Sequence, residues 1–253
     1  MSDRLREVVP DMLAAIHEVL ERHQVTEEEW FGALAFLGEV AKADELILLS
    51  DVTRTSVLID ALSHGGDESG ATASDVEGPM YTDVPPFRTK IYEEYEGMGD
   101  EDPLFVRGRV TSTDGSPLPG AVVDVWQTGP AGGYDLWDER QPEGNFRGRV
   151  RAEDDGAYEF QTMLPKPYTV PTTGPTGRYL EAVGQHPWRP AHIHFKVEAP
   201  GHRKLVTQVF FPGDPYLEND TIGAVKPALV RPVERENGHL TCRFDIALAP
   251  QSA

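Results

Sequence analysis

LTCRFDIAL, residues 240–248, is the stretch that decides the fold of this chain. Its apolar residues alternate with more polar ones, and a period of two places them on one face of a β-strand. Short β-rich runs separated by Gly, Pro and Asp turns precede it, which is typical of a sandwich or barrel. These runs are 104–111, 121–128, 157–162, 191–199 and 204–211. The chain is therefore predicted to be mainly β, with residues 103–253 as an antiparallel β-sandwich.

The N-terminal residues carry the periodicity of helices. Apolar residues between Leu5 and Leu20 recur at spacings of three and four, which places them on one helix face. Pro10 interrupts this run, so the helix is expected to start there or to bend there. A second helix is expected after Thr26, which stands at capping-box spacing from Glu29.

The helical part has a visible end. A third helix is predicted over 44–63, and a stretch rich in Gly, Ser and Asp follows it at 64–75. Residues 1–65 are therefore predicted to be a helical N-terminal region and residues 66–102 a linker to the sandwich.

The charge of the chain limits its partners. A formal net charge of −19 repels nucleic acid and anionic membrane surfaces, which bind through clustered Lys and Arg. No run of about 18 apolar residues predicts membrane insertion. The single cysteine, Cys242, excludes an intramolecular disulfide and fits a reducing cytosol, so a cytoplasmic location is expected.

Two histidines could form half of a metal site. His192 and His194 stand two residues apart in QHPWRPAHIHF (185–195), and a strand would point both to one face. The alternative is a hydrogen-bonded core histidine beside an exposed one. A ferrous site with two histidines and one carboxylate would need Asp214 or Glu198 to reach the pair.

Two tyrosines lie in loops next to the predicted strands, Tyr134 in GPAGGYD and Tyr168 in LPKPYTVP. Loops at the edge of a rigid sandwich commonly carry ligands. A phenol has an ordinary pKa of about 10 and binds a metal only where a strongly charged ion, such as ferric iron, favours the phenolate. Otherwise each tyrosine would be a packed aromatic residue with its hydroxyl hydrogen-bonded.

Ordered segments over nearly the whole chain resemble one family. They are ILLSDVTRTSVLIDALSH (47–64), GATASDVEGPMY (70–81), PLPGAVVDVWQT (117–128) with GGYD (132–135), LPKPYTVPTTGPTG (164–177), HPWRPAHIHFKVEAPG (186–201) and LVTQVFFPGDPYL (205–217). The family they resemble is the intradiol ring-cleavage dioxygenases, which includes catechol, chlorocatechol and hydroxyquinol 1,2-dioxygenases and protocatechuate 3,4-dioxygenase. The helical N-terminus is similar to the catechol and hydroxyquinol branch.

This resemblance implies a cofactor and an assembly. A non-haem Fe(III) ion would be bound by Tyr134, Tyr168, His192 and His194. The N-terminal helices would form a homodimer interface, in which a bound lipid could lie. The chain departs from the usual VWHA pattern of the family with VWQT, where Gln127 is more similar to protocatechuate enzymes.

The resemblance also implies a reaction. A catechol-type substrate would be cleaved by O2 between its two hydroxylated carbons, giving a cis,cis-muconate-type product. Tyr168 would leave the iron and take a catechol proton. Arg189 would stabilise negative charge on the substrate, and Gln208 would orient the site by hydrogen bonding.

The resemblance is less specific about the substrate pocket, and other functions remain as alternatives. Five residues correspond to family segments that line the ring pocket, with 66–102 contributing to its rim: Pro79, Met80, Tyr81, Thr221 and Ile222. Protocatechuate cleavage is one alternative, and it would need an extra cation for the substrate carboxylate. Another is a non-catalytic binding module, because 106–126 and 152–160 also resemble transthyretin-like sandwiches.

Overall fold

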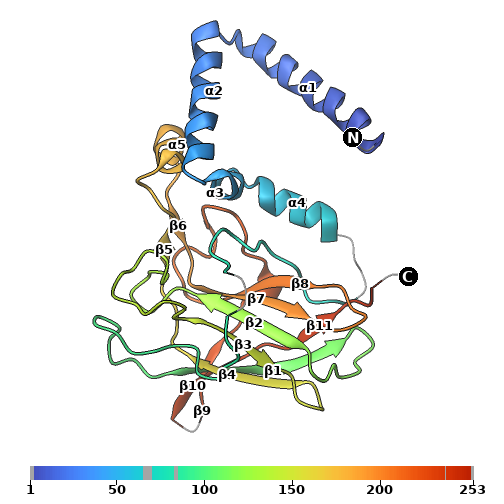
Figure 1. Cartoon of the computed structure of the whole chain (residues 1–253), viewed down its shortest axis with the longest axis vertical. Helices are drawn as coiled ribbons and strands as arrows, with labels where there is room; N and C mark the ends of the chain where they lie inside the picture. Colours follow the sequence, from blue (N-terminus) through green and yellow to red (C-terminus); the bar gives the residue numbers. More distant parts are fainter. Residues whose placement is uncertain (1–2, 65–69, 83–84, 237, 252–253) are drawn as a thin grey trace. The chain divides into compact units, whose positions relative to one another are not determined.

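The computed structural model of the chain describes residues 3–64, 70–82, 85–236 and 238–251 (Figure 1). By its internal contacts the chain divides into two compact units, Met1–Glu45 and Leu46–Ala253. None of the helices in the described residues combines the length and the apolar character that crossing a bilayer requires.

Two helices form the first unit, α1 (Asp3–His23) and α2 (Glu27–Lys42). The predicted capping box is present, since the Thr26 side chain accepts from the Glu29 amide and the Glu29 carboxylate accepts from the Thr26 amide at 2.8 Å. A helix start at Pro10 is wrong, because α1 begins at Asp3 and continues through the proline. Proline fixes φ at a helical value, so α1 continues through it, although the helix loses one hydrogen bond and the ring crowds the carbonyl four residues earlier.

Residues 44–63 were expected as one helix, but they form two, α3 (Leu46–Val52) and α4 (Thr55–His64). The break falls at Arg54, whose φ of 60° lies in the left-handed region. The Thr53 hydroxyl donates to the Ser50 carbonyl at 3.0 Å. This carbonyl at the end of α3 is thus satisfied without a further helical turn.

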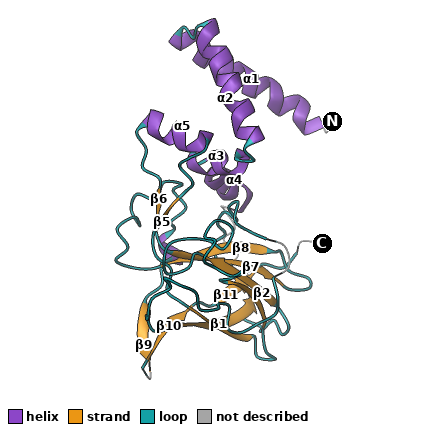
Figure 2. Cartoon of the chain, turned by 60° about the vertical axis from the view of Figure 1, so that its left-hand side comes forward, coloured by secondary structure: helices purple, strands orange, loops and turns teal. Residues whose placement is uncertain are grey.

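The strands form three sheets (Figures 1 and 2). In the five-stranded sheet, β1 pairs with β4 on one edge and with β10 and then β11 on the other, and β9 lies beside β10. The four-stranded sheet has the order β3-β2-β7-β8, and β5 pairs with β6. The bounds are β1 (Leu104–Ser112), β2 (Val122–Gln127), β3 (Arg147–Arg151), β4 (Ala157–Thr162), β5 (Tyr168–Thr169), β6 (Trp188–Arg189), β7 (His192–Glu198), β8 (Leu205–Phe210), β9 (Val233–Glu236), β10 (His239–Arg243) and β11 (Ile246–Leu248), with α5 (Pro175–Val183) and the 3-10 turn η1 (Pro227–Leu229) between strands.

Two parts of the predicted fold class need correction. β1 runs parallel to β10 and β11, whereas the expectation was an antiparallel arrangement throughout. The parallel pairs join the first strand to the last two, and the intervening four-stranded sheet supplies the long crossover that parallel pairing needs. In the described residues the helices contain slightly more residues than the strands, so a mainly-β description applies to 103–253 alone.

The stretch LTCRFDIAL alternates in burial from Cys242 onward but forms two strands, β10 and β11, separated by Phe244 and Asp245. At the break the Phe244 carbonyl accepts from the Tyr158 hydroxyl at 2.6 Å. The Asp245 carboxylate accepts from the Arg109 amide at 2.9 Å. A Cβ at Gly108 would lie 1.9 Å from the Phe244 oxygen, so the chains can approach here only because residue 108 is glycine.

One hydrophobic core receives side chains from both larger sheets. The ring of Phe195 in β7 lies 6.1 Å from that of Phe160 in β4 and 5.1 Å from that of Phe244. Leu48 and Val52 of α3 belong to the same core. Because burying an apolar side chain of this size contributes about 1.5–3 kcal/mol, the core fixes α3 beside the sheets.

The four-stranded sheet has two chemically different faces. Val125 of β2 pairs with Phe195 of β7, and both belong to the core. The neighbouring pair, Trp126 with His194, points to the opposite face, and His194 also pairs with Gln208 of β8. Since paired residues share a face, this second face gathers polar and aromatic side chains.

Candidate functional site

His192 and His194 lie on this second face, and both are 2% exposed. Their Nε2 atoms are 3.1 Å apart. Nδ1 of His192 is 2.7 Å from the Pro190 carbonyl, which can only accept, so Nδ1 carries the proton and Nε2 keeps a lone pair. The Trp126 ring stacks on His194 with centroids 4.7 Å apart and an interplanar angle of 4°. The two Nε2 atoms therefore face each other, and the tautomer of His192 leaves its Nε2 able to bind a cation.

Tyr134 and Tyr168 meet this pair from two other segments. The Tyr134 and Tyr168 rings lie 5.7 Å apart at 90°, and the Tyr168 ring lies 5.6 Å from that of His192. Tyr168 is in the short strand β5, where it pairs with Arg189, and not in a loop as expected. The partner of this two-residue strand is β6, which is followed closely by β7, the strand that carries both histidines.

Burial is the main influence on the pKa of all four side chains. It raises the pKa of Tyr134 well above its ordinary value, and it raises that of Tyr168 against the opposing effect of Arg189. It lowers the pKa of both His192 and His194 well below the ordinary value. Without a cation the phenols are therefore protonated and the imidazoles neutral. A highly charged cation would favour the phenolates.

The donor set fits ferric iron better than a carboxylate-bound metal. The Tyr134 hydroxyl and Nδ1 of His194 are buried and have no hydrogen-bond partner within the described residues. Among those residues no three His, Cys, Asp or Glu side chains group as metal ligands. Asp214 instead accepts from the Ala191 amide, and Glu198 pairs with Lys204. Two imidazoles and two phenols are thus the available ligands.

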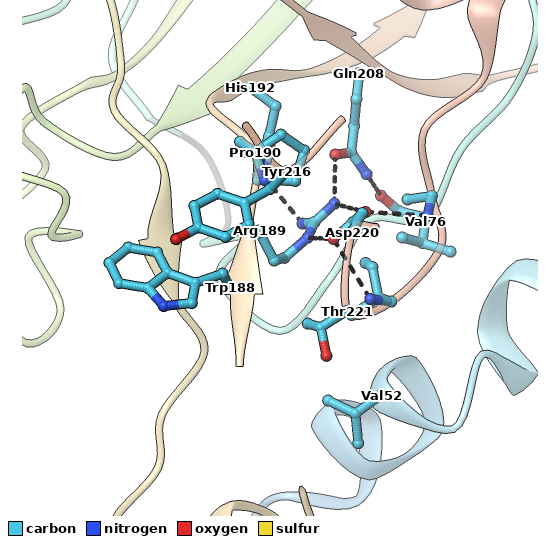
Figure 3. A network of polar contacts seen from close by, with 12 residues as sticks. Val52, Val76, Trp188, Arg189, Pro190, His192, Gln208, Tyr216, Asp220 and Thr221 are labelled. Atoms are coloured by element: carbon cyan, nitrogen blue, oxygen red, sulfur yellow. Dashed lines mark hydrogen bonds and ion pairs between the residues drawn. The ribbon is translucent and has the colours of Figure 1, made fainter. Parts of the chain in front are cut away.

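Arg189 occupies the centre of a buried polar network (Figure 3). Its Nη1 is 3.0 Å from His192 Nε2, and its Nη2 donates to Gln208 Oε1 at 3.1 Å. Gln208 donates in turn to the Val76 carbonyl at 2.9 Å. Asp220 forms an ion pair with Arg189. The network brings the two residues expected from the sequence, Arg189 and Gln208, directly beside the histidines.

A cavity opens beside these groups, and Tyr134, Tyr168, Arg189 and His194 form part of its wall. Three of the five expected pocket residues line it, namely Pro79, Met80 and Ile222. Leu48, Asp51, Gly78, Trp137, Val170 and Pro171 complete the lining. A larger open groove over β1 and β4 contains none of the four candidate ligands.

The other two expected pocket residues lie behind the cavity lining. The Tyr81 hydroxyl donates to Asp124 at 3.0 Å, and the Tyr81 ring packs edge-on against Trp126. Thr221 is buried, and its carbonyl and hydroxyl both accept from Gln185. Neither residue is part of the cavity lining.

Two family models together match nearly the whole chain. The model described as catechol dioxygenase N terminus matches residues 2–70, and the model described as dioxygenase matches residues 76–250. The chain belongs to the intradiol dioxygenase family.

Relatives of this dioxygenase cover most of its length. It is 39% identical to hydroxyquinol 1,2-dioxygenase of Rhizobium sp. (strain MTP-10005), over 92% of the chain and 80% of that protein. It is 36% identical to chlorocatechol 1,2-dioxygenase of Burkholderia cepacia, over 100% of the chain and 98% of that protein. Among solved structures, hydroxyquinol 1,2-dioxygenase from Pseudomonas putida DLL-E4 has a TM-score of 0.87 and 34% identity, covering 99% of the chain and 93% of that structure.

Gln127, the departure from the family pattern, faces away from the candidate metal ligands of this dioxygenase. It pairs with Ile193, so it lies on the core face of the sheet. Its amide donates to the Thr128 and Met163 carbonyls, and its oxygen accepts from the Thr162 hydroxyl. All its polar atoms are satisfied in the core, so Gln127 does not alter the histidine pair directly.

Sequence reasoning missed Asp51 and Asp220. Asp51 on α3 lines the cavity of the dioxygenase, and Asp220 pairs with Arg189. Both are about as buried as the histidines, at 3% exposure. A signal was available, because Asp51 stands in a segment that resembles the family and Asp220 lies three residues after another. However, an isolated Asp in a polar stretch is usually an exposed side chain.

Proposed function

We propose that this intradiol dioxygenase opens the ring of a catechol-type substrate with O2 at a non-haem ferric centre, giving a cis,cis-muconate-type product. The meeting of two buried phenols and two buried imidazoles carries this proposal: Tyr134, Tyr168 and His194 line one cavity, and His192 lies against His194 with the Nε2 atoms 3.1 Å apart. Tyr134, Tyr168, His192 and His194 would hold the iron. When bound, ferric iron would lower the pKa of the coordinated phenols and make a bound catecholate reactive toward O2.

Tyr168 is proposed as the base for the substrate. A phenolate released next to the cavity has a high enough proton affinity to take a proton from a catechol hydroxyl. The backbone of Tyr168 is held by its pairing with Arg189 between β5 and β6. The side chain would therefore be able to exchange the iron for a substrate proton while the backbone stays in place.

Arg189 is proposed to stabilise the negative charge that develops on the ring when O2 attacks. Its guanidinium lines the cavity and is 3% exposed, and charge stabilisation is strongest where water is excluded. Gln208 would keep Nη2 of Arg189 directed by the hydrogen bond to its side-chain oxygen.

The cavity wall favours a neutral, hydroxylated ring over a carboxylated one. Asp51 is the acidic group in the described lining, and burial raises its pKa. Arg189 is the cation of that lining, and it is already paired with Asp220. A protocatechuate carboxylate would meet Asp51 without a free cation, whereas a third ring hydroxyl could form a hydrogen bond with it. We therefore favour catechol and hydroxyquinol substrates over protocatechuate.

Asp51→Ala is expected to change this preference. The variant should lose about tenfold to 100-fold in kcat/KM for hydroxyquinol relative to catechol, since a hydrogen bond to a carboxyl group contributes about 1.5–3 kcal/mol. Oxygen uptake with both substrates measures the ratio. Leu48→Ala, which alters the same cavity wall from α3 without a polar group, should leave the ratio unchanged. An unchanged ratio in Asp51→Ala would remove Asp51 from substrate recognition.

An oxygen-uptake assay of the iron-reconstituted protein tests the function itself. Catechol, hydroxyquinol, chlorocatechols and protocatechuate should be compared, with visible absorption as a second readout, because tyrosinate bound to ferric iron is coloured. Activity on the first three and little on protocatechuate is expected. Colourless, inactive protein after reconstitution would favour the alternative of a transthyretin-like binding module.

We also propose an organisation for the whole chain. Residues 103–253 would be a catalytic β-sandwich, supported by the core that both larger sheets share. Residues 66–102 would contribute to the rim, since Gly78, Pro79 and Met80 line the cavity. The free, buried thiol of Cys242 is compatible with the reducing cytosol, which we propose as the compartment.

Residues 1–65 are proposed to form a homodimer interface, with a lipid between the helices. The apolar face of α1 supports this, because large side chains such as Met12 and Ile16 are 58% and 41% exposed, and contiguous exposed apolar surface marks interaction sites. Ile16→Glu is expected to convert a dimer into a monomer in sedimentation velocity. Ala14→Glu, on the opposite helix face, should not. A wild-type protein that sediments as a monomer would contradict the interface.

A further inference from the structure

We propose that Asp220 is a positioning residue of the dioxygenase, which holds the Arg189 guanidinium in the orientation needed for ring cleavage and fixes it to the cavity wall at Ile222. The proposal rests on the proposed function, because it concerns how Arg189 is aimed at the substrate.

Arg189 and Asp220 form an ion pair through two hydrogen bonds (Figure 3). Nε of Arg189 donates to Oδ1 of Asp220 at 3.2 Å, and Nη2 donates to Oδ2 at 3.4 Å. The two side chains are 3% and 1% exposed. Both carboxylate oxygens therefore engage one edge of the guanidinium, and this arrangement fixes its plane as well as its place.

The contacts of Arg189 with Asp220 and Gln208 also decide which guanidinium nitrogen faces the histidines. Nη2 also donates to Gln208, so Asp220 and Gln208 together hold Nε and Nη2. Nη1 is the nitrogen left on the histidine side, 3.0 Å from His192 Nε2. Rotation of the guanidinium would break the contacts with Asp220, so Asp220 determines that Nη1 is the atom presented to the site.

Asp220 is also linked to the cavity wall. Its carboxylate accepts from the amides of Ile222 at 3.4 Å and Ala224 at 3.0 Å. The intervening Thr221 amide donates to the Trp188 carbonyl, next to Arg189. Ile222 lines the cavity. One carboxylate thus links the Arg189 guanidinium to a residue of the cavity wall.

Charge balance also points to Asp220. Burial acts to lower the pKa of Arg189, but Asp220 acts to raise it, and the net shift is upward. Burial raises the pKa of Asp51, and it raises the pKa of Asp75 to about 7. Of these three carboxyls near Arg189, Asp220 alone makes a direct ion pair with it.

Asp220→Asn tests the proposal, because the amide keeps the shape but turns a donor toward the donors of Arg189. We expect kcat to fall about tenfold to 100-fold, as for groups that orient catalytic residues. Iron content, visible absorption and the affinity for 4-nitrocatechol under anaerobic conditions should stay within threefold of wild type, about the scatter of such constants. This split between kcat and binding is not what general destabilisation would produce.

Asp214→Asn is the matched control. Asp214 also accepts two backbone amides, those of Ala191 and Tyr216, but no contact with Arg189 is present in the described residues. It should lower the melting temperature of the apo protein without lowering kcat. If kcat falls in both variants in proportion to the loss in melting temperature, the proposal is overturned.

A double-mutant cycle shows whether Asp220 acts through Arg189. In an Arg189→Met background, Asp220→Asn should cause no further loss of kcat. It should also raise the melting temperature of apo Arg189→Met, by removing an unpaired buried carboxylate, a comparison that holds even if Asp220→Asn alone does not fold. Additive losses of kcat, or no gain in stability, would overturn the proposal. Wild type inactive on every catechol would instead refute the proposed function.

Discussion

Iron-reconstituted Tyr134→Phe is expected to be colourless and to consume oxygen only at the background rate. The change removes one hydroxyl that has no hydrogen-bond partner among the described residues, so the fold should lose little. It would, however, remove one of the two anionic ligands of a trivalent ion in a buried site, where charge must be compensated locally. Iron analysis, the visible spectrum and oxygen uptake measure the three effects.

Tyr158→Phe is the control for this experiment. Tyr158 is also fully buried, and its hydroxyl donates to the Phe244 carbonyl far from the cavity. The variant should lose about 1 kcal/mol of stability, as expected for a buried hydrogen bond, and keep iron, colour and turnover. Tyr134→Phe protein that retains wild-type iron content and colour would remove Tyr134 from the ligand set.

Arg189→Met is expected to retain iron but to lower kcat about 100-fold to 1,000-fold, the effect of removing one donor that stabilises charge in a dry site. The variant also leaves Asp220 buried without its partner, which should cost about 3–5 kcal/mol of stability. Both effects are checked on one preparation, by oxygen uptake at saturating catechol and by urea unfolding of the apo protein.

Arg189→Lys separates charge from geometry. Lysine keeps the positive charge but cannot engage Asp220 and Gln208 through a planar fork. We expect kcat between the wild-type and Arg189→Met values. Wild-type turnover in Arg189→Met would show that charge stabilisation does not come from this residue.

For the four candidate metal ligands, local sequence patterns predicted only part of the arrangement. Strand alternation alone predicted that His192 and His194 share a face, and the register of β7 confirms it. The two tyrosines had no comparable local pattern, since Tyr134 and Tyr168 are 34 residues apart in sequence and come together only through packing. The assignment of these tyrosines as ligands came from the family resemblance.

The errors in the predicted fold arise where a contact between distant segments overrides a local pattern. The apolar residues of LTCRFDIAL do alternate, yet the strand breaks at Phe244. There the Tyr158 hydroxyl donates to the Phe244 carbonyl, and the absence of a side chain at Gly108 lets that carbonyl lie close to β1. The helix over 44–63 breaks at Arg54, where no proline or glycine marks the position. At this second break the Thr53 hydroxyl donates locally to the Ser50 carbonyl, and Gln185, distant in sequence, donates to the Val52 carbonyl.

The sequence by itself determined the alternating strand at 240–248, the helical N-terminal region and the histidine pair, because these depend on spacing within a few residues. Tertiary structure decided the rest. It split that strand, made its pairing with β1 parallel, and brought Asp51 to the cavity and Asp220 to Arg189 from separate segments. The physical reason is that a buried carboxylate or carbonyl is stabilised by partners far away in sequence, and no local pattern records which partner folding will supply.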